Sequence, residues 1–290
     1  MLAAATLTLT GCGSDENGIA EPQLQEKTAQ LELRLTGSGV STKATGSALP
    51  TQAEENTLKR FTVAIFNSDN SVNAIRTITT NMTSATTINC TPAAGCTGIV
   101  VANAPTDNYF AGVLNKTDFL KKTITLADAQ AKDCLPMSGD VKDGSGNATF
   151  TLSAGSNTGM TAQLLRLVAR VSISSIKTAF DPNGQYAAAS YELKNIFVRN
   201  AMQEAVPGTG GYSTTKMGTP AYLTGNYDKS TGTVAYLANS VTPPVDVSAE
   251  HKTDYWFYIL PNKKPPIRHW YWKVHSRKTQ TIREVPSITR

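Results

Sequence analysis

Cys12 is the residue most clearly placed for chemistry in this 290-residue sequence. It ends a Leu-Thr-Gly-Cys segment, and residues 1–11 before it are mostly small and apolar. Small residues at this spacing before a cysteine are typical of a bacterial lipoprotein signal, in which the cysteine thiol carries the lipid. We therefore expect residues 1–11 to be part of a signal peptide and Cys12 to be lipidated. The alternative is an ordinary thiol in an unstructured N-terminus.

The segment before Cys12 lacks the positive charge that begins a secretory signal, because no Lys or Arg precedes the cysteine. We therefore expect the natural start to lie further upstream. A polar and partly acidic run, residues 13–17, follows the cysteine and resembles the surface-export signal of Bacteroidota lipoproteins. The expected location is the outer membrane, as a lipoprotein precursor exposed at the cell surface.

Three further cysteines, Cys90, Cys96 and Cys134, do not define a disulfide framework. Cys90 and Cys96 flank a turn-rich loop that a small disulfide would close, but an odd number of cysteines beyond Cys12 leaves the pairing open. A structural zinc site needs Cys or His residues at coordinating intervals, and the three histidines of the sequence form no such motif. We expect no metal ion and no cofactor.

Motifs for catalysis are missing from the sequence. It contains no nucleophile elbow, Walker loop or dinucleotide fingerprint, and the Gly-rich residues 208–211 lack the flanking strand and helix of a phosphate loop. Carboxylates are scattered without an identifiable acid–base pair. Residues 143–147 and 181–184 have too few ligands for a calcium loop and indicate turns. We expect a protein that is not an enzyme.

The net charge of +5 comes from the end of the chain rather than from its body. Residues 265–290 contain six basic residues and one acidic residue, so the first 264 residues are neutral overall. A nucleic-acid-binding protein carries its basic patch on the folded body. We therefore expect no nucleic-acid partner.

Alternating apolar and polar residues predict strands in the first half of the chain. In residues 31–36 the alternation places Leu31, Leu33 and Leu35 on one face. Further strands are expected over residues 61–66, 98–102, 109–114 and 149–152, and one short helix over residues 125–132. The small residues over 37–47 cannot pack a core, so they predict an exposed and flexible loop that proteases can reach.

The pattern restarts near residue 160, where alternate apolar positions from Leu165 to Ile173 predict a long strand. Residues 191–200 form another expected strand, whose apolar phase changes near Asn195 as a β-bulge would produce. Residues 255–260 are apolar on both faces and predict a covered strand. The length predicts two domains, and many short strands between turns predict an all-β protein made of β-sandwiches with minor helix.

The order of these segments is similar to that of the major fimbrial subunits (fimbrillins) of Bacteroidales. The similarity is carried by the lipoprotein segment, the strand at 31–36, the loop with Lys-Ala-Thr-Gly at 43–46, and residues 58–66. It continues through residues 101–105, 135–139, 167–171 and 257–262. The resemblance implies two tandem transthyretin-like β-sandwich domains, expected at residues 44–160 and 161–290.

The resemblance also implies that a trypsin-like surface protease removes the first strand of the precursor. By position the cut falls between Lys43 and Ala44, so residues 12–43 would be the lipid tether and the removable strand. Family members often carry Arg at the cut, whereas this chain has Lys.

Removal of such a strand would have a direct physical consequence for assembly. If the strand that carries Leu31, Leu33 and Leu35 leaves, it exposes unpaired backbone groups and empty side-chain sites. A strand from another subunit can then fill both. The alternative is that residues 31–36 are a permanent first strand and that Lys43 is an ordinary loop charge.

The chain changes character after Pro266, where a Trp-Tyr-Trp cluster precedes basic, unpatterned residues. Read from the third base of each codon, residues 269–274 encode Leu-Val-Leu-Glu followed by Gly or Ser, whatever synonymous codons are used. The resemblance implies an apolar strand at this point, so we expect residues from about 265 to 290 to be out of frame. The alternative is an aromatic platform that stacks on sugars or binds nucleic acid, since basic and aromatic residues together can bind either.

The sequence therefore predicts a structural subunit of a cell-surface fimbria, assembled by proteolytic removal of the first strand and donor-strand exchange, and mediating adhesion. The expected partners are further copies of the chain or other fimbrial subunits, the outer membrane through the lipid on Cys12, and the trypsin-like protease. The alternative function is a surface glycan-binding lipoprotein with β-sandwich domains.

Overall fold

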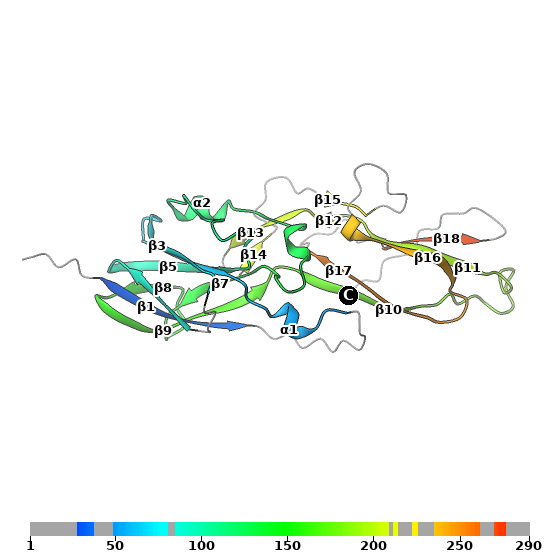
Figure 1. Cartoon of the computed structure of the whole chain (residues 1–290), viewed down its shortest axis with the longest axis horizontal. Coiled ribbons are helices and arrows are strands. Elements are labelled where there is room, and N and C mark those ends of the chain that lie inside the picture. The colour runs from blue at the N-terminus through cyan, green and yellow to red at the C-terminus, as the bar shows by residue number, and fades with distance from the viewer. Residues whose placement is uncertain are drawn as a thin grey trace, which may run out of the picture.

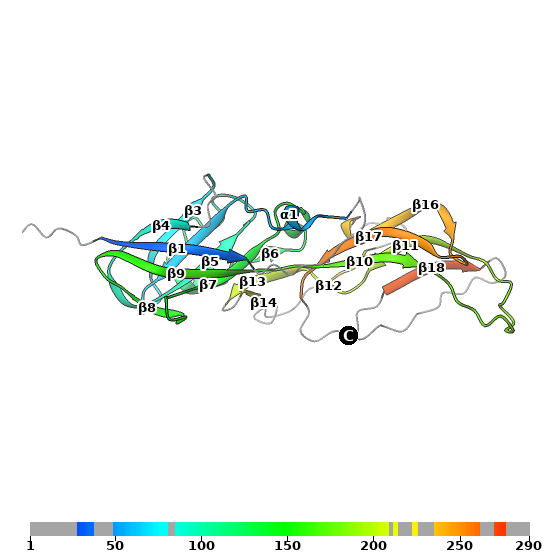
Figure 2. The ribbon, with the colours of Figure 1, turned by 90° about the horizontal axis from the view of Figure 1, so that it is seen from below.

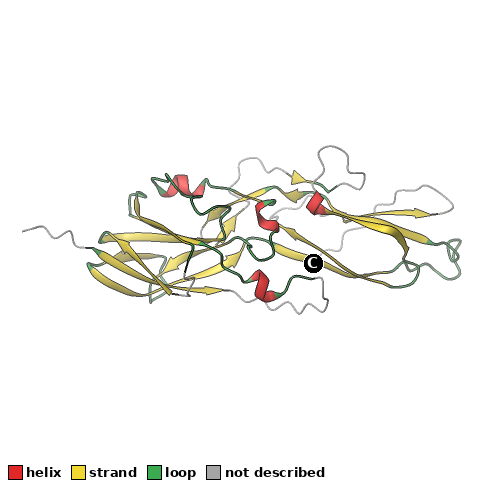
Figure 3. Cartoon of the chain, viewed as in Figure 1, coloured by secondary structure: helices red, strands yellow, loops and turns green. Residues whose placement is uncertain are grey.

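The computed structural model of the chain describes residues 28–37, 49–80, 85–208, 211–213, 222–225, 235–261 and 270–276. Strands dominate these residues and the helices are short, so the expected all-β fold is confirmed. Figure 1 shows an elongated molecule with two β-rich parts arranged end to end, and Figure 3 shows how little of it is helix.

The first part is one mixed sheet in the strand order β3-β2-β5-β7-β9-β1-β4, with β8 paired to β5. Its strands are β1 (Ala29–Gly37), β2 (Phe61–Phe66), β3 (Val72–Ile78), β4 (Ala85–Cys90), β5 (Ala93–Ala102), β7 (Met137–Lys142), β8 (Thr149–Leu152) and β9 (Gly155–Arg166). The two end strands of this order, β3 and β4, lie next to each other. The sheet therefore curls around an enclosed apolar core.

Both faces of this sheet are covered at β2, all of whose residues are buried. Phe61, Val63 and Ile65 belong to the enclosed core, whereas Ala64 and Phe66 belong to a second cluster on the outer face. That outer cluster is completed by the segment carrying α2 (Lys116–Leu120), including Phe119. A strand that is apolar at every position except Thr62 fits this place, because alternate side chains meet different cores.

The prediction of a strand over residues 109–114 is wrong. These residues form turns and loop, and Gly112 has a left-handed φ of +75°. Phe110 and Val113 are apolar because they pack on the outer face of the sheet from this loop, not because they alternate along a strand. The helix expected over residues 125–132 is reduced to the single 3₁₀ turn η1 (Asp128–Gln130), which follows the short strand β6 (Ile124–Thr125).

The second part contains several small sheets and one further 3₁₀ turn, η2 (Ala235–Leu237). The strands after β9 are β10 (Ala169–Ile176), β11 (Tyr191–Val198), β12 (Ala201–Met202), β13 (Glu204–Gly208), β14 (Gly211–Ser213), β15 (Tyr222–Leu223), β16 (Ala238–Asp246), β17 (His251–Ile259) and β18 (Trp270–Ser276). Of these, β13 and β14 lie against β7 of the first sheet. β10 pairs with β17, β11 lies between β16 and β18, and β12 pairs with β15. The register of β11 shifts between Leu193 and Asn195, which confirms the expected bulge.

Strand pairing and shared core residues join the two parts, in addition to the covalent chain. β9 runs through position 160 and keeps its pairing with β7 as far as Arg166. β6 pairs with β13, and Leu126 donates a backbone hydrogen bond to the carbonyl of Gln203 at 2.7 Å. The core of the second part also includes Ile124 and Leu135. The first sheet therefore extends past residue 160, and residues near 124–135 pack with the second part.

Candidate functional site

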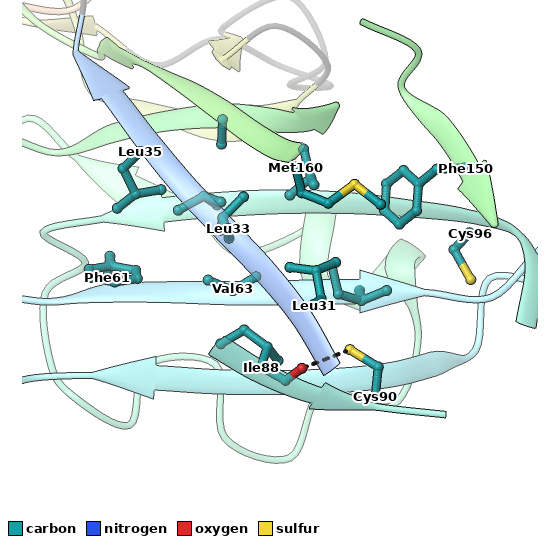
Figure 4. Packing of buried hydrophobic residues seen from close by; sticks show 14 of the residues in the cluster. Leu31, Leu33, Leu35, Phe61, Val63, Ile88, Cys90, Cys96, Phe150 and Met160 are labelled. Carbon is teal, nitrogen blue, oxygen red and sulfur yellow. Dashed lines mark hydrogen bonds between the residues drawn. The ribbon is translucent and has the colours of Figure 1, made fainter. Parts of the chain in front are cut away.

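The strand β1 is the candidate functional element, and the alternation of apolar and polar residues along it determines which face is buried. Leu31, Leu33 and Leu35 are 0%, 1% and 7% exposed, whereas the residues between them are exposed. Figure 4 shows these leucines pointing into the enclosed core, over Phe61 and Val63 of β2. The predicted buried face of the first strand is therefore present.

β1 is an inner strand of the sheet. It pairs antiparallel with β4, from Ala29 opposite Cys90 to Arg34 opposite Ala85. On its other side it pairs parallel with β9, from Ala29 opposite Gly155 to Gly37 opposite Leu164. Figure 2 shows β1 running beside β9 along the length of this sheet. Its removal would therefore leave two facing strands without a partner between them.

A bulge in β9 sets the register on the parallel side. Leu31 lies opposite Asn157 but Leu33 lies opposite Met160, so β9 holds one extra residue in this interval. Gly159 takes the left-handed φ of +79° that such a bulge uses. The bulge returns the side chain of Met160 to the core, where it is 5% exposed.

The outward face of β1 makes only a few polar contacts. The hydroxyl of Ser156 donates to Oε1 of Glu32 at 2.8 Å, and Asn157 Nδ2 donates to the carbonyl of Gln30 at 3.4 Å. These contacts lie at exposed positions, where water competes for both partners. The buried leucines and the two backbone ladders therefore hold β1 in place.

The cysteines near β1 are free thiols in the described part of the chain, so the loop disulfide left open by the sequence is not formed. Cys90 and Cys96 both belong to the enclosed core around β1. Burial raises the pKa of the Cys90 thiol to about 11, with a smaller contribution from the charge of Cys96. Burial also raises the pKa of the Cys96 thiol. Both thiols are therefore protonated and unreactive while β1 covers the core.

Three residues singled out from the sequence lie outside the described residues, namely Cys12, Lys43 and Ala44. The described chain stops at Gly37 and resumes at Leu49. The predicted processing position is thus in the connection between β1 and the short helix α1 (Gln52–Glu55).

The first turn after this connection is anchored by a buried charged cluster that sequence reasoning missed. Glu55 is 3% exposed, and its Oε1 accepts hydrogen bonds from Arg170 Nη1 and from the Tyr258 hydroxyl, both at 2.8 Å. Arg166 Nη1 lies 3.7 Å from the other carboxylate oxygen. Arg170 also donates to the carbonyl of Pro50 at 2.5 Å.

This cluster connects α1 to β9, β10 and β17. Burial, and then the hydrogen bond to Glu55, raise the pKa of the Tyr258 hydroxyl. The sequence gives little indication of this cluster, because the glutamate, the arginines and the tyrosine are far apart along the chain. Thr51 gives the one local signal, since it forms a capping box with Glu54 at the start of α1.

Other kinds of site are not seen in the part of the chain that the structure describes. No group of three or more His, Cys, Asp or Glu side chains there is placed to hold a metal ion. Within the same residues, no helix is both long and apolar enough to cross a membrane.

A family model described as "Major fimbrial subunit protein (FimA)" matches residues 29–179. The match begins at the first residue of β1 and extends just beyond β10, so it covers the whole first sheet. It includes more than half of the chain. None of the curated proteins matches the chain.

Solved structures share the fold at low sequence identity. A candidate cell adhesion protein from Parabacteroides distasonis has a TM-score of 0.63 and 16% identity, with 86% of this chain and 76% of that chain covered. A candidate cell adhesion protein from Bacteroides eggerthii has a TM-score of 0.57 and 20% identity, with 88% and 77% covered. A fimbrilin (fimA) from Porphyromonas gingivalis has a TM-score of 0.55 and 19% identity, with 80% and 65% covered. At these identities the likeness concerns the fold alone.

Proposed function

Because the chain belongs to the major fimbrial subunit protein family, we propose that it is a structural subunit of a cell-surface fimbria that polymerises by exchange of β1. The family places the chain among fimbrial subunits, which assemble with other subunits. The exchange mechanism is our proposal. The observation that supports it is the position of β1, which is buried along one face and lies between β4 and β9.

Release of β1 requires that its tether be cut, because the strand is otherwise part of the same chain. We infer that a trypsin-like surface protease cuts between Lys43 and Ala44. After the cut only side-chain burial and backbone ladders would hold β1. Three buried leucines contribute about 2 kcal/mol each, so an incoming strand with similar apolar residues can replace them.

The incoming strand would come from a second copy of the chain or from another fimbrial subunit. It must be apolar at alternate positions to fill the sites of Leu31, Leu33 and Leu35, and it must satisfy the backbone groups of both β4 and β9. Before processing, lipid on Cys12 would hold the precursor in the outer membrane. The assembled fimbria would mediate adhesion.

The reading frame near Pro265 or Pro266 bears on whether this chain can donate a strand as well as accept one. The segment Trp270–Ser276 forms β18 and pairs with β11. We propose that the natural frame encodes the Leu-Val-Leu-Glu strand here. Resequencing the gene across these codons tests the proposal, and an unbroken frame in an expressed protein would contradict it.

The proposed function is tested by limited trypsin digestion of the frame-corrected protein. Cleavage after Lys43 is expected to produce oligomers that resist SDS, because exchanged strands are held by both burial and ladders. The Lys43→Gln variant should remain monomeric. Lys121→Gln is the matched control, since Lys121 is an exposed lysine of the folded body, and it should polymerise normally. A trimmed monomer would contradict strand exchange and would favour the glycan-binding lipoprotein.

A further inference from the structure

β4 is the strand that depends most on β1. Among the described strands β4 pairs only with β1, and it is the last strand in the order of the sheet. β9, on the other side of β1, also pairs with β7. Departure of β1 would therefore remove the whole ladder of β4 but only one of the two ladders of β9.

β4 has a second attachment, made by side chains of β3 rather than by a ladder. Asn73 Nδ2 donates to the carbonyl of Thr91, just after β4, and Asn73 Oδ1 accepts from the backbone nitrogen of Thr91, both at 2.9 Å. Arg76 Nη1 donates to the carbonyl of Thr87 at 3.1 Å. The three bonds join the two end strands of the curled sheet.

The side chain of Asn73 is itself held in place. Its Nδ2 also donates to Oδ1 of Asn67 at 2.7 Å, in the turn between β2 and β3. The amide group therefore meets the Thr91 backbone as a neighbouring peptide group would, with one donor and one acceptor. None of these bonds involves β1, so all of them can persist when β1 has left.

We propose that Asn73 and Arg76 are positioning residues that hold β4 in place while β1 is absent, so that the β1 site stays ready for a strand from a second copy of the chain. The β1 site is the space between β4 and β9. The inference rests on the proposed strand exchange. Without the β3 side chains, an incoming strand would first have to order β4, and the entropy cost of doing so would weaken its binding.

The position of β4 affects binding of an incoming strand, because β4 supplies part of the apolar lining of the β1 site. Ile88 and Cys90 point into the enclosed core and are 1% and 7% exposed. Ile88 lies opposite Leu31, and Cys90 lies opposite Ala29. If β4 moved away, an incoming strand would lose both its antiparallel ladder and these two apolar contacts.

The test uses the full chain cleaved after Lys43 and a fluorescent synthetic peptide with the sequence of residues 29–37. The peptide replaces the cleaved strand, and its incorporation is measured by the fluorescence that stays with the protein on gel filtration. We expect the Asn73→Ala/Arg76→Gln variant to bind the peptide at least about tenfold more weakly than the natural sequence, since three hydrogen bonds to β4 are lost. Asn89→Ala, at an exposed asparagine of β4 itself, is the matched control and should bind normally.

A second measurement separates positioning from general stability. Hydrogen exchange of the β4 amides is followed in the uncleaved protein, where β1 still pairs with β4. The variant should protect these amides as the natural sequence does before cleavage and lose protection only after it. Arg76→Gln alone, which leaves both bonds between Asn73 and Thr91 in place, provides a milder variant if the double substitution does not fold.

The outcomes are distinct. Equal peptide binding by the natural sequence and the variant would overturn the role of Asn73 and Arg76 while leaving strand exchange intact. Loss of β4 protection in the uncleaved variant would also overturn it, because β4 would then need β3 whether or not β1 is present. Failure of the natural sequence to incorporate the peptide would remove the proposed exchange itself, and this inference with it.

Discussion

The carboxylate of Glu55 accepts a hydrogen bond of 2.8 Å from the guanidinium of Arg170, and only 4% and 10% of the two side chains is exposed. The pair links the connection after β1 to β10 in the second part of the molecule. Removing one member of such a pair leaves the other charge buried and poorly compensated. The cost is about 3–5 kcal/mol in comparable cases.

We therefore expect Glu55→Ala to lower the free energy of unfolding by a few kcal/mol, on the order of 3, as measured by urea denaturation. Lys59→Gln is the control, because Lys59 and Asp133 form an exposed pair at 2.6 Å and such pairs contribute about 1 kcal/mol or less. Equal effects of the two substitutions would show that the Glu55 cluster is not a major source of stability.

Leu33 is the middle leucine on the buried face of β1, and its truncation should weaken the hold on this strand. Leu33→Ala is expected to lower the free energy of unfolding by about 2–5 kcal/mol, because it removes apolar contacts and leaves a cavity. In the cleaved protein it should also speed the release of β1. Arg34→Ala, on the exposed face, should change the stability by no more than about 0.5 kcal/mol. Unfolding curves that coincide would contradict the burial of β1.

Cys90 reports whether β1 has left its site. Burial holds the pKa of its thiol at about 11, so at pH 8 only about 0.1% is the reactive thiolate even before access is considered. A maleimide reagent should therefore label Cys90 slowly in the uncleaved protein and much faster when β1 departs. Cys134, which is only partly buried, should be labelled at a similar rate in both states. Peptide mapping by mass spectrometry distinguishes them, and fast labelling of Cys90 before cleavage would argue against a covered site.

Glu54 should have a depressed pKa because its carboxylate is hydrogen-bonded when ionised. Contact with Lys132, and then with the backbone and hydroxyl of Thr51, lowers its pKa from 4.5 to about 2. A folded-state pKa below the unfolded value means that this contribution to stability is present above about pH 4.5 and is lost as the pH falls toward 2. An NMR titration of the Glu54 side chain in Lys132→Ala should show its pKa rising back toward 4.5. An unchanged titration would assign the shift to Thr51 instead.

Much of the fold follows from local pattern. The period of two in β1 identified the face that carries Leu31, Leu33 and Leu35, and the change of phase near Asn195 identified the bulge in β11. The same pattern predicts a strand wrongly over residues 109–114, because apolar residues in a loop that packs on a sheet resemble one side of a strand. Phe110 and Val113 take their burial from β2 and β5 and not from a ladder of their own.

The alternation of residues 31–36 was enough to predict a strand with one leucine face, because side chains of an extended chain point to opposite sides in turn. It did not determine that β1 would lie between β4 and β9, since both partners are distant in sequence and pairing depends on where the whole sheet closes. Nor did it indicate that Glu55 would meet Arg170 and Tyr258, or that Asn73 would bind the end of β4. Such contacts join side chains whose elements come together only on folding, so only the tertiary structure decides them.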